Sequence, residues 1–189
     1  NGETRTGLTT MKIDAGLDTG PALLQYETDI GPDETAPELA ARLAEAGAPL
    51  IAETLRKLDL GKIIPTPQDN SLATHAPSLK KADGRIDWSL PAQQIYNRIR
   101  GLDPWPGAFT SFRGKNCHLW GKPASQPVAA AALPSSSPGG IVSQHGDTSV
   151  VCGDVTLLHL EFVQLEGRKR VTAQEFANGA RLSPSDRFV

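Results

Sequence analysis

Strand-like residues run directly into an Asp- and Gly-rich loop in the stretch Leu8-Thr9-Thr10-Met11-Lys12-Ile13-Asp14-Ala15-Gly16-Leu17-Asp18-Thr19-Gly20. Its first six residues have the composition of a strand, and a second strand-like segment occupies residues 23–30. The Asp- and Gly-rich residues between the two segments predict a loop that can carry functional side chains.

A long helix is expected after the second strand. The segment Thr35-Ala36-Pro37-Glu38 has capping-box spacing with a proline in the first turn, so the helix should begin near Ala36. Leucines then recur close to a helical period, which predicts one buried face. Gly47 and Pro49 should interrupt or kink this helix. The order strand, loop, strand, helix indicates the edge of an α/β domain.

The second half of the chain has a different pattern. Residues 63–85 contain three prolines and little periodicity, which predicts an interdomain linker. Pro91 can open a short helix with Ile95, Ile99 and Leu102 on one side. Short strands then alternate with Gly-containing turns and predict a small barrel; they are expected at residues 108–112, 116–120, 141–144, 149–152 and 155–160. Residues 126–140, rich in Ala, Pro and Ser, are expected to form a flexible barrel loop.

Composition and charge limit the possible functions. The 189 residues are 39% hydrophobic, no apolar run is long enough to cross a bilayer, and the N-terminal residues do not resemble a signal peptide, so we expect a cytoplasmic protein without membrane attachment. Cys117 and Cys152 lack metal-binding or disulfide spacing, and we expect ordinary thiols and no metal. The net charge of −2 combines −6 over residues 1–60 with +4 over residues 61–189, so a polyanion would favour the second part.

Several separated motifs carry a family resemblance. They are Thr6-Gly7-Leu8-Thr9-Thr10-Met11 with the loop 14–20, Arg85-Ile86-Asp87-Trp88-Ser89, Asp103-Pro104-Trp105-Pro106-Gly107-Ala108, Leu165-Glu166-Gly167-Arg168-Lys169-Arg170 and Glu175-Phe176-Ala177-Asn178-Gly179. In this order and spacing the chain resembles methionyl-tRNA formyltransferases over essentially its whole length.

The resemblance implies an α/β fold class with a particular division of the chain. Residues 1–63 would be the C-terminal remnant of a Rossmann-like formyltransferase domain, 64–86 a linker, and 87–189 an OB-like β-barrel domain that binds tRNA. The family's catalytic Asn and His, and the Ser-Leu-Leu-Pro segment that contacts folate, would lie upstream of Asn1. Asp18 is therefore the one catalytic residue that the resemblance assigns to this chain, and we expect the 189 residues alone to be inactive.

Formyl transfer from 10-formyltetrahydrofolate to an amine requires attack on a carbonyl, stabilisation of an oxyanion and removal of a proton. A carboxylate such as Asp18 can orient an imidazole or relay the proton of the amine. The alternative is an Asp that only forms a turn beside Gly16 and Gly20. The surrounding motifs favour the catalytic role for Asp18, whereas Asp14 is expected to form a turn.

The second substrate implied by the resemblance is methionyl-initiator tRNA, bound by a monomer. Two basic clusters could contact its phosphates: Lys80, Lys81 and Arg85 at the start of the barrel, and Arg168, Lys169 and Arg170 near the C-terminus. Such contacts would set affinity and salt dependence rather than the choice of tRNA. Solubilising surface charge is the alternative interpretation of both clusters.

Two other functions remain open from the sequence. A formyltransferase that modifies a nucleotide sugar would share Asp18 and a similar Pro-Trp-Pro-Gly segment but would not bind tRNA. A stand-alone OB-type nucleic-acid-binding module would have no use for the first 60 residues. The basic segment 168–170 favours the tRNA enzyme over the sugar enzyme.

Overall fold

The computed structural model describes residues 1–125, 137–144, 147–183 and 185–189. Contacts within the chain define two compact units. The N-terminal unit comprises Glu3–Ser78, and the C-terminal unit comprises Leu79–Val189 together with Asn1 and Gly2. Within the described ranges, no helix has the length and apolar character needed to cross a membrane.

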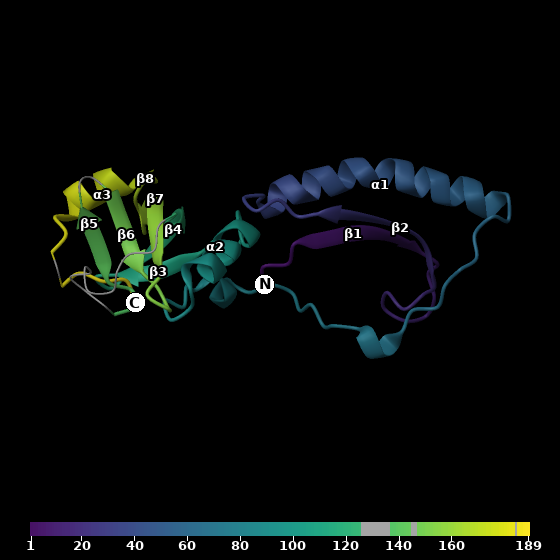
Figure 1. Cartoon of the computed structure of the whole chain (residues 1–189), viewed down its shortest axis with the longest axis horizontal. Helices are drawn as coiled ribbons and strands as arrows, with labels where there is room; N and C mark the ends of the chain where they lie inside the picture. The colour runs from purple at the N-terminus through teal and green to yellow at the C-terminus, as the bar shows by residue number, and fades with distance from the viewer. Residues whose placement is uncertain (126–136, 145–146, 184) are drawn as a thin grey trace. The chain divides into compact units, whose positions relative to one another are not determined.

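The N-terminal unit is a β-hairpin covered on one side by a helix (Figure 1). Strands β1 (Arg5–Met11) and β2 (Ala22–Asp29) pair antiparallel, and α1 (Ala36–Asp59) follows. The predicted helix start is confirmed. The backbone N–H of Thr35 donates to the Glu38 carboxylate at 2.8 Å, and this hydrogen bond lowers the pKa of Glu38.

The expected interruption of α1 is wrong, because the helix continues through Gly47 and Pro49 to Asp59. Pro49 lies on the exposed side, where water can satisfy the carbonyl that the proline leaves without a partner. The opposite side is fixed on the hairpin. The hydroxyls of Thr54 and Thr10 are 2.9 Å apart, and Leu8 comes close to the backbone of Gly47.

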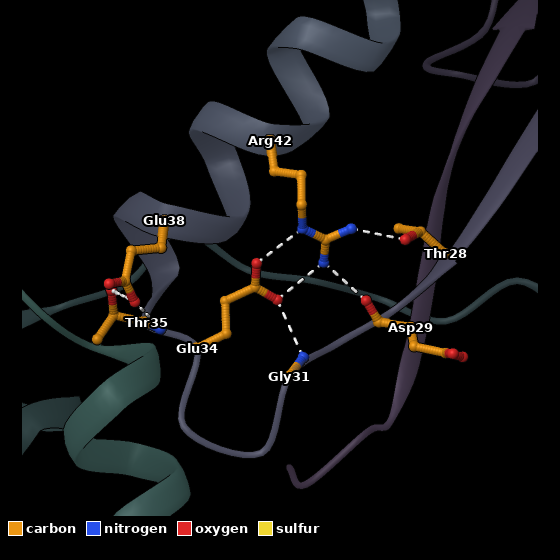
Figure 2. Close-up of polar contacts among 7 residues, drawn as sticks. All are labelled: Thr28, Asp29, Gly31, Glu34, Thr35, Glu38 and Arg42. Carbon is orange, nitrogen blue, oxygen red and sulfur yellow. Dashed lines mark hydrogen bonds and ion pairs between the residues drawn. The ribbon is translucent and has the colours of Figure 1, made fainter.

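Arg42 joins α1 to the end of β2 and to the turn between them (Figure 2). Its guanidinium donates two hydrogen bonds to Glu34, both at 2.8 Å, and further bonds to the Thr28 hydroxyl at 2.6 Å and the Asp29 carbonyl at 2.7 Å. The same Glu34 carboxylate accepts from the Gly31 N–H at 3.0 Å. This network sets the angle at which the helix leaves the hairpin.

The Pro-rich segment predicted as a linker packs partly on the hairpin. Thr66 and Ala22 exchange two backbone hydrogen bonds, at 2.8 and 2.9 Å, so residue 66 extends the ladder of β2. A 3-10 turn, η1 (Asn70–Leu72), follows and is capped by Asp69, while η2 (Lys81–Gly84) belongs to the C-terminal unit. The division between the units therefore falls inside the predicted linker segment.

The C-terminal unit is a curled antiparallel sheet with two helices. The helices are α2 (Ala92–Gly101) and α3 (Ala173–Ala180). The strands are β3 (Phe109–Phe112), β4 (Lys115–Pro123), β5 (Ile141–Gln144), β6 (Asp147–Val151), β7 (Leu157–Leu165) and β8 (Val171–Thr172). Their order in the sheet is β3-β4-β7-β6-β5, and β8 pairs with β7 off this path.

Most of the predicted elements of this unit are confirmed. Helix α2 follows Pro91 and buries Ile95 and Ile99. Arg113 and Gly114, both with positive φ, form the two-residue turn between β3 and β4. Strand β7 starts two residues later than expected because Asp154 and Val155 adopt left-handed φ angles and form a turn. The predicted flexible loop lies mostly outside the described residues.

The C-terminal residues connect the two edges of this sheet. Phe188 bridges Phe112 of β3, and Arg187 bridges Gly140 next to β5. Phe188 is fully buried, where it stacks on Trp88 with ring centroids 5.8 Å apart. The core around it is apolar and includes Ile95, Leu119, Val150, Leu158, Leu160, Val163 and Phe176.

Candidate functional site

The loop between β1 and β2 is closed at its base by backbone contacts. The Lys12 N–H donates to the Pro21 carbonyl at 3.0 Å. Gly20 is buried, and a Cβ at this position would lie 1.6 Å from the Lys12 carbonyl oxygen, so no other residue fits without moving the backbone. The glycine at the end of the motif is therefore required by a close approach of two chain segments.

Asp14 has the turn-forming role expected for it. Its carboxylate accepts the Gly16 N–H at 3.1 Å and the Thr19 hydroxyl at 2.7 Å. These contacts fix the first half of the loop from inside and engage one carboxylate oxygen twice.

Asp18 differs from Asp14 in both backbone and environment. Its φ of 55° is left-handed, its side chain is exposed, and its carboxylate has no hydrogen-bond partner among the described residues. It lines a cavity of about 940 Å³ between the hairpin and residues 66–76. A carboxylate with free oxygens on a cavity can accept a proton from a bound molecule or orient a second group, as predicted for Asp18.

Two residues on this cavity were not singled out by the sequence. Gln68 and His75 both line it and come from the segment interpreted as a linker. Gln68 donates to the carbonyls of Asp18 and Gly20, at 2.8 and 2.7 Å. No local pattern could reveal this contact, because it joins residues 50 and 48 positions apart.

Arg168 and Lys169 are exposed in the turn between β7 and β8. They line a second cavity, of about 690 Å³, together with Glu175 and Phe176 of α3. The Arg168 N–H donates to the Leu165 carbonyl at 2.9 Å, which fixes the backbone of the turn. The turn therefore fixes the backbone at Arg168 and Lys169, and both side chains face solvent.

Arg170 has a different environment from its two neighbours. Its guanidinium lies over the rings of Trp120 and Phe162, 4.1 Å from each ring centroid. A guanidinium between two aromatic faces is bound by cation–π attraction and packs its flat surface on carbon. Among the described residues, Arg170 therefore has an aromatic contact that Arg168 and Lys169 lack.

The other predicted basic cluster lies at the start of the C-terminal unit. Lys80, Lys81 and Arg85 are all exposed. The backbone N–H of Lys80 donates to the Asp83 carboxylate at 2.6 Å, and Arg85 bridges Phe109 through its backbone. The structure brings these three residues together around η2.

No metal site is formed by the residues that the structure describes. Cys117 and Cys152 are free and buried, and burial raises the pKa of each thiol to about 12. Burial therefore disfavours the reactive thiolate form of both residues.

Comparison with curated proteins identifies close relatives along the whole chain. The methionyl-tRNA formyltransferase of Solibacter usitatus is 54% identical over 188 residues, and that of Koribacter versatilis is 49% identical over 187 residues. These matches cover 100% and 99% of the chain. In each case the chain spans 58% of the relative's length.

Solved structures share the fold at low sequence identity. HypX from Aquifex aeolicus in complex with tetrahydrofolic acid matches with a TM-score of 0.63 and 16% identity, over 100% of this chain and 34% of that one. The sugar 3N-formyl transferase WlaRD gives a TM-score of 0.62 at 15% identity, over 89% and 57% of the two chains. Methionyl-tRNA formyltransferase from Clostridium thermocellum gives 0.51 at 20% identity, over 79% and 58%.

Two family models match consecutive parts of the sequence. The formyl transferase model matches residues 1–55, which include the Asp18 loop. The model of the formyl transferase C-terminal domain matches residues 78–181, more than half of the chain. The chain therefore belongs to the formyl transferase family.

Proposed function

We propose that the protein carrying this chain transfers a formyl group from 10-formyltetrahydrofolate to the amino group of methionyl-initiator tRNA, in the cytoplasm, for translation initiation. The observation that carries the proposal is the 54% identity to a methionyl-tRNA formyltransferase over the entire chain, with the Asp18 loop included. The open Asp18 carboxylate on a cavity supports the same reaction.

In this reaction the amine nitrogen of the methionyl group attacks the formyl carbon. A new C–N bond forms, the bond from the formyl carbon to the folate nitrogen breaks, the attacking nitrogen loses a proton and the departing folate nitrogen gains one. Asp18 would accept that proton directly or through water. A carboxylate already engaged by donors, such as Asp14, would be a poorer acceptor, which supports the assignment of the role to Asp18.

The cavity beside Asp18 suits a folate-sized ligand. Its volume of about 940 Å³ is within the usual range for small-molecule sites. Its lining combines apolar side chains such as Leu17 and Leu72 with polar ones such as Thr19 and Asn70. We propose that these residues contribute to one wall of the site for the formyl donor.

We also propose that the C-terminal unit is an OB-like barrel that binds tRNA, with domain limits at 1–63, 64–86 and 87–189. The bridges of the C-terminal residues to β3 and to Gly140 next to β5 support a closed sheet. Exposure of Lys80, Lys81, Arg85, Arg168 and Lys169 supports phosphate contact, and Arg170 would add charge while packing on its two rings. The protein would bind the tRNA as a monomer.

The tRNA interface can be tested by salt dependence. Replacing Arg168 and Lys169 together by Ala should weaken binding of methionyl-initiator tRNA and reduce the log–log salt slope by about 0.7 to 0.9 for each phosphate that the variant no longer neutralises. Lys62→Ala, in the other unit, is the control and should leave the slope unchanged. An unchanged slope in the double variant would remove both residues from the interface.

A second function is favoured by one observation, the similarity to a solved sugar 3N-formyl transferase. The discriminating experiment offers the protein two acceptors, methionyl-initiator tRNA and an amino sugar linked to dTDP, with the same formyl donor. We expect transfer to the tRNA alone. Transfer to the sugar would replace the proposed acceptor, and tRNA binding without transfer to either would favour a nucleic-acid-binding module.

A further inference from the structure

A single side-chain amide spans the loop that carries Asp18. The Gln68 Nε2 donates to the Asp18 carbonyl at 2.8 Å and to the Gly20 carbonyl at 2.7 Å. Both carbonyls are acceptors, so the nitrogen end of the amide must face the loop, where Nε2 also lies 3.9 Å from the Met11 Sδ. Among the described residues, no other side chain from outside the loop hydrogen bonds to the Asp18 backbone.

The position of Gln68 is set by the strand pairing just before it. Thr66 forms a two-bond bridge with Ala22, the first residue of β2 after the loop. Pro65 and Pro67 flank Thr66, and proline restricts both its own φ and the conformation of the residue before it. The segment is therefore extended beyond its bridge to Ala22, and this conformation places residue 68 over the loop.

The loop needs an outside contact at Asp18 in particular. Asp14 holds Gly16 and Thr19, and Gly20 is fixed by its close approach to Lys12. Asp18 lies between these fixed points with a left-handed φ of 55°, which is unfavourable for a residue with a Cβ. Its carboxylate supplies no local bond to stabilise this conformation.

We propose that Gln68 is a positioning residue that holds Asp18 in the orientation required for formyl transfer. The inference rests on the proposed function, because it assigns Asp18 a role in the reaction. Gln68 acts through the backbone of Asp18 and leaves the carboxylate free for the reacting amine. The segment after α1 thereby becomes part of the active-site support rather than a plain connection between domains.

The kinetic test uses Gln68→Met in the protein that carries this chain. Methionine keeps the length of the side chain but removes both donors. We expect kcat for formyl transfer to fall about 10- to 100-fold, the range seen when a reacting group is misplaced by a small distance, with KM for methionyl-initiator tRNA nearly unchanged. Gln68→Glu, which presents only acceptors to the two carbonyls, should be at least as slow.

A double variant separates positioning from general folding. If Gln68 acts through Asp18, then Gln68→Met should cause little further loss of kcat in an Asp18→Asn background. Gln93→Met is the matched control, since Gln93 is exposed on α2 and bonds only to Asn97 at 3.3 Å. Unchanged melting temperatures and tRNA affinity would show that the loss is not a loss of folded protein.

Hydrogen exchange of the 189-residue chain tests the contact without any activity. Amides of residues 12–22 should exchange at least about fivefold faster in Gln68→Met, as expected for hydrogen bonds of ordinary strength, and at the normal rate in Gln93→Met. An unchanged kcat in Gln68→Met would overturn the inference. An equal fold-loss of kcat on adding Gln68→Met to the unsubstituted protein and to the Asp18→Asn variant would also overturn it. If the unsubstituted protein transfers no formyl group, the proposed function is wrong, and Gln68 has no role in that reaction. Hydrogen exchange would still show whether Gln68 holds the loop.

Discussion

At the scale of single residues, two aspartates of one loop show how environment separates roles. One oxygen of the Asp14 carboxylate accepts a backbone N–H and a hydroxyl, whereas Asp18 is held through its backbone carbonyl and its carboxylate has no partner among the described residues. Composition alone would treat both as turn residues. The hydrogen bonds distinguish the aspartate that supports the loop from the one that we propose as the proton acceptor.

Arg170 was predicted only as a phosphate contact, but in the structure it also packs on two aromatic rings. Its guanidinium packs on Trp120 and Phe162, so Arg170→Lys should lower the melting temperature although the charge is kept, because a compact ammonium cannot cover two rings. Arg168→Lys, without aromatic contacts, is the control and should melt as the unsubstituted chain does. Equal melting temperatures for both variants, measured by circular dichroism, would contradict this role.

At the scale of elements, Arg42 is the junction of β2 and α1. Glu34 raises the pKa of the Arg42 guanidinium, and the fork geometry serves four acceptor atoms at once. Arg42→Lys keeps the charge but cannot reproduce these contacts, so its melting temperature should fall.

Arg56→Lys is the matched control for this variant. Arg56 also binds a glutamate, Glu53, at 2.7 Å, but as an exposed pair within one helix. Such pairs contribute little to stability, so melting should be almost unchanged. If both variants melt at the same temperature, the junction has no special stabilising role.

The C-terminal residues are tied to the β3–β4 turn by an ion pair. Arg113 donates to Asp186 at 2.8 and 2.6 Å, and this partner lowers the pKa of the Asp186 carboxyl well below its usual range. The stabilisation is present above the pKa of an unfolded Asp, about 3.9, and is lost as pH falls through the lower folded-state value.

Asp186→Asn should therefore lower the melting temperature most at neutral pH. Because protonation removes the same contribution from the unsubstituted chain, the difference in melting temperature between the two should shrink as pH falls below about 4. Asp154→Asn, in the turn before β7, serves as the control. A difference that stays constant between pH 7 and pH 2 would show that the ion pair does not supply the stability.

At the scale of the whole molecule, local patterns predicted most elements and missed what depends on distant contacts. The capping box located α1, and the Gly-containing turn expected between residues 112 and 116 located a hairpin. Pro49 did not interrupt α1, since the packing of one helix face on the hairpin outweighs the local cost of proline. The bridge from Thr66 to Ala22 and the contact of Gln68 with the loop have no local signature.

The candidate site was predictable to the same extent. Asp18 was predicted from a contiguous motif, and the structure places it on a cavity; its role in the reaction stays a prediction. The basic segment 168–170 was visible in the sequence as a run of charge. The sequence could not show that Arg170 packs on aromatic rings while its two neighbours face solvent, because the rings come from β4 and β7.

Single-turnover kinetics of Asp18→Asn test whether Asp18 takes part in formyl transfer to methionyl-initiator tRNA. The substitution keeps the size of the side chain and removes its ability to accept a proton, so the rate should fall about 100- to 10,000-fold while tRNA affinity and folding stay unchanged. Asp59→Asn, at the exposed end of α1, is the control and should react at the normal rate. An Asp18→Asn rate close to that of the unsubstituted protein would contradict the assignment.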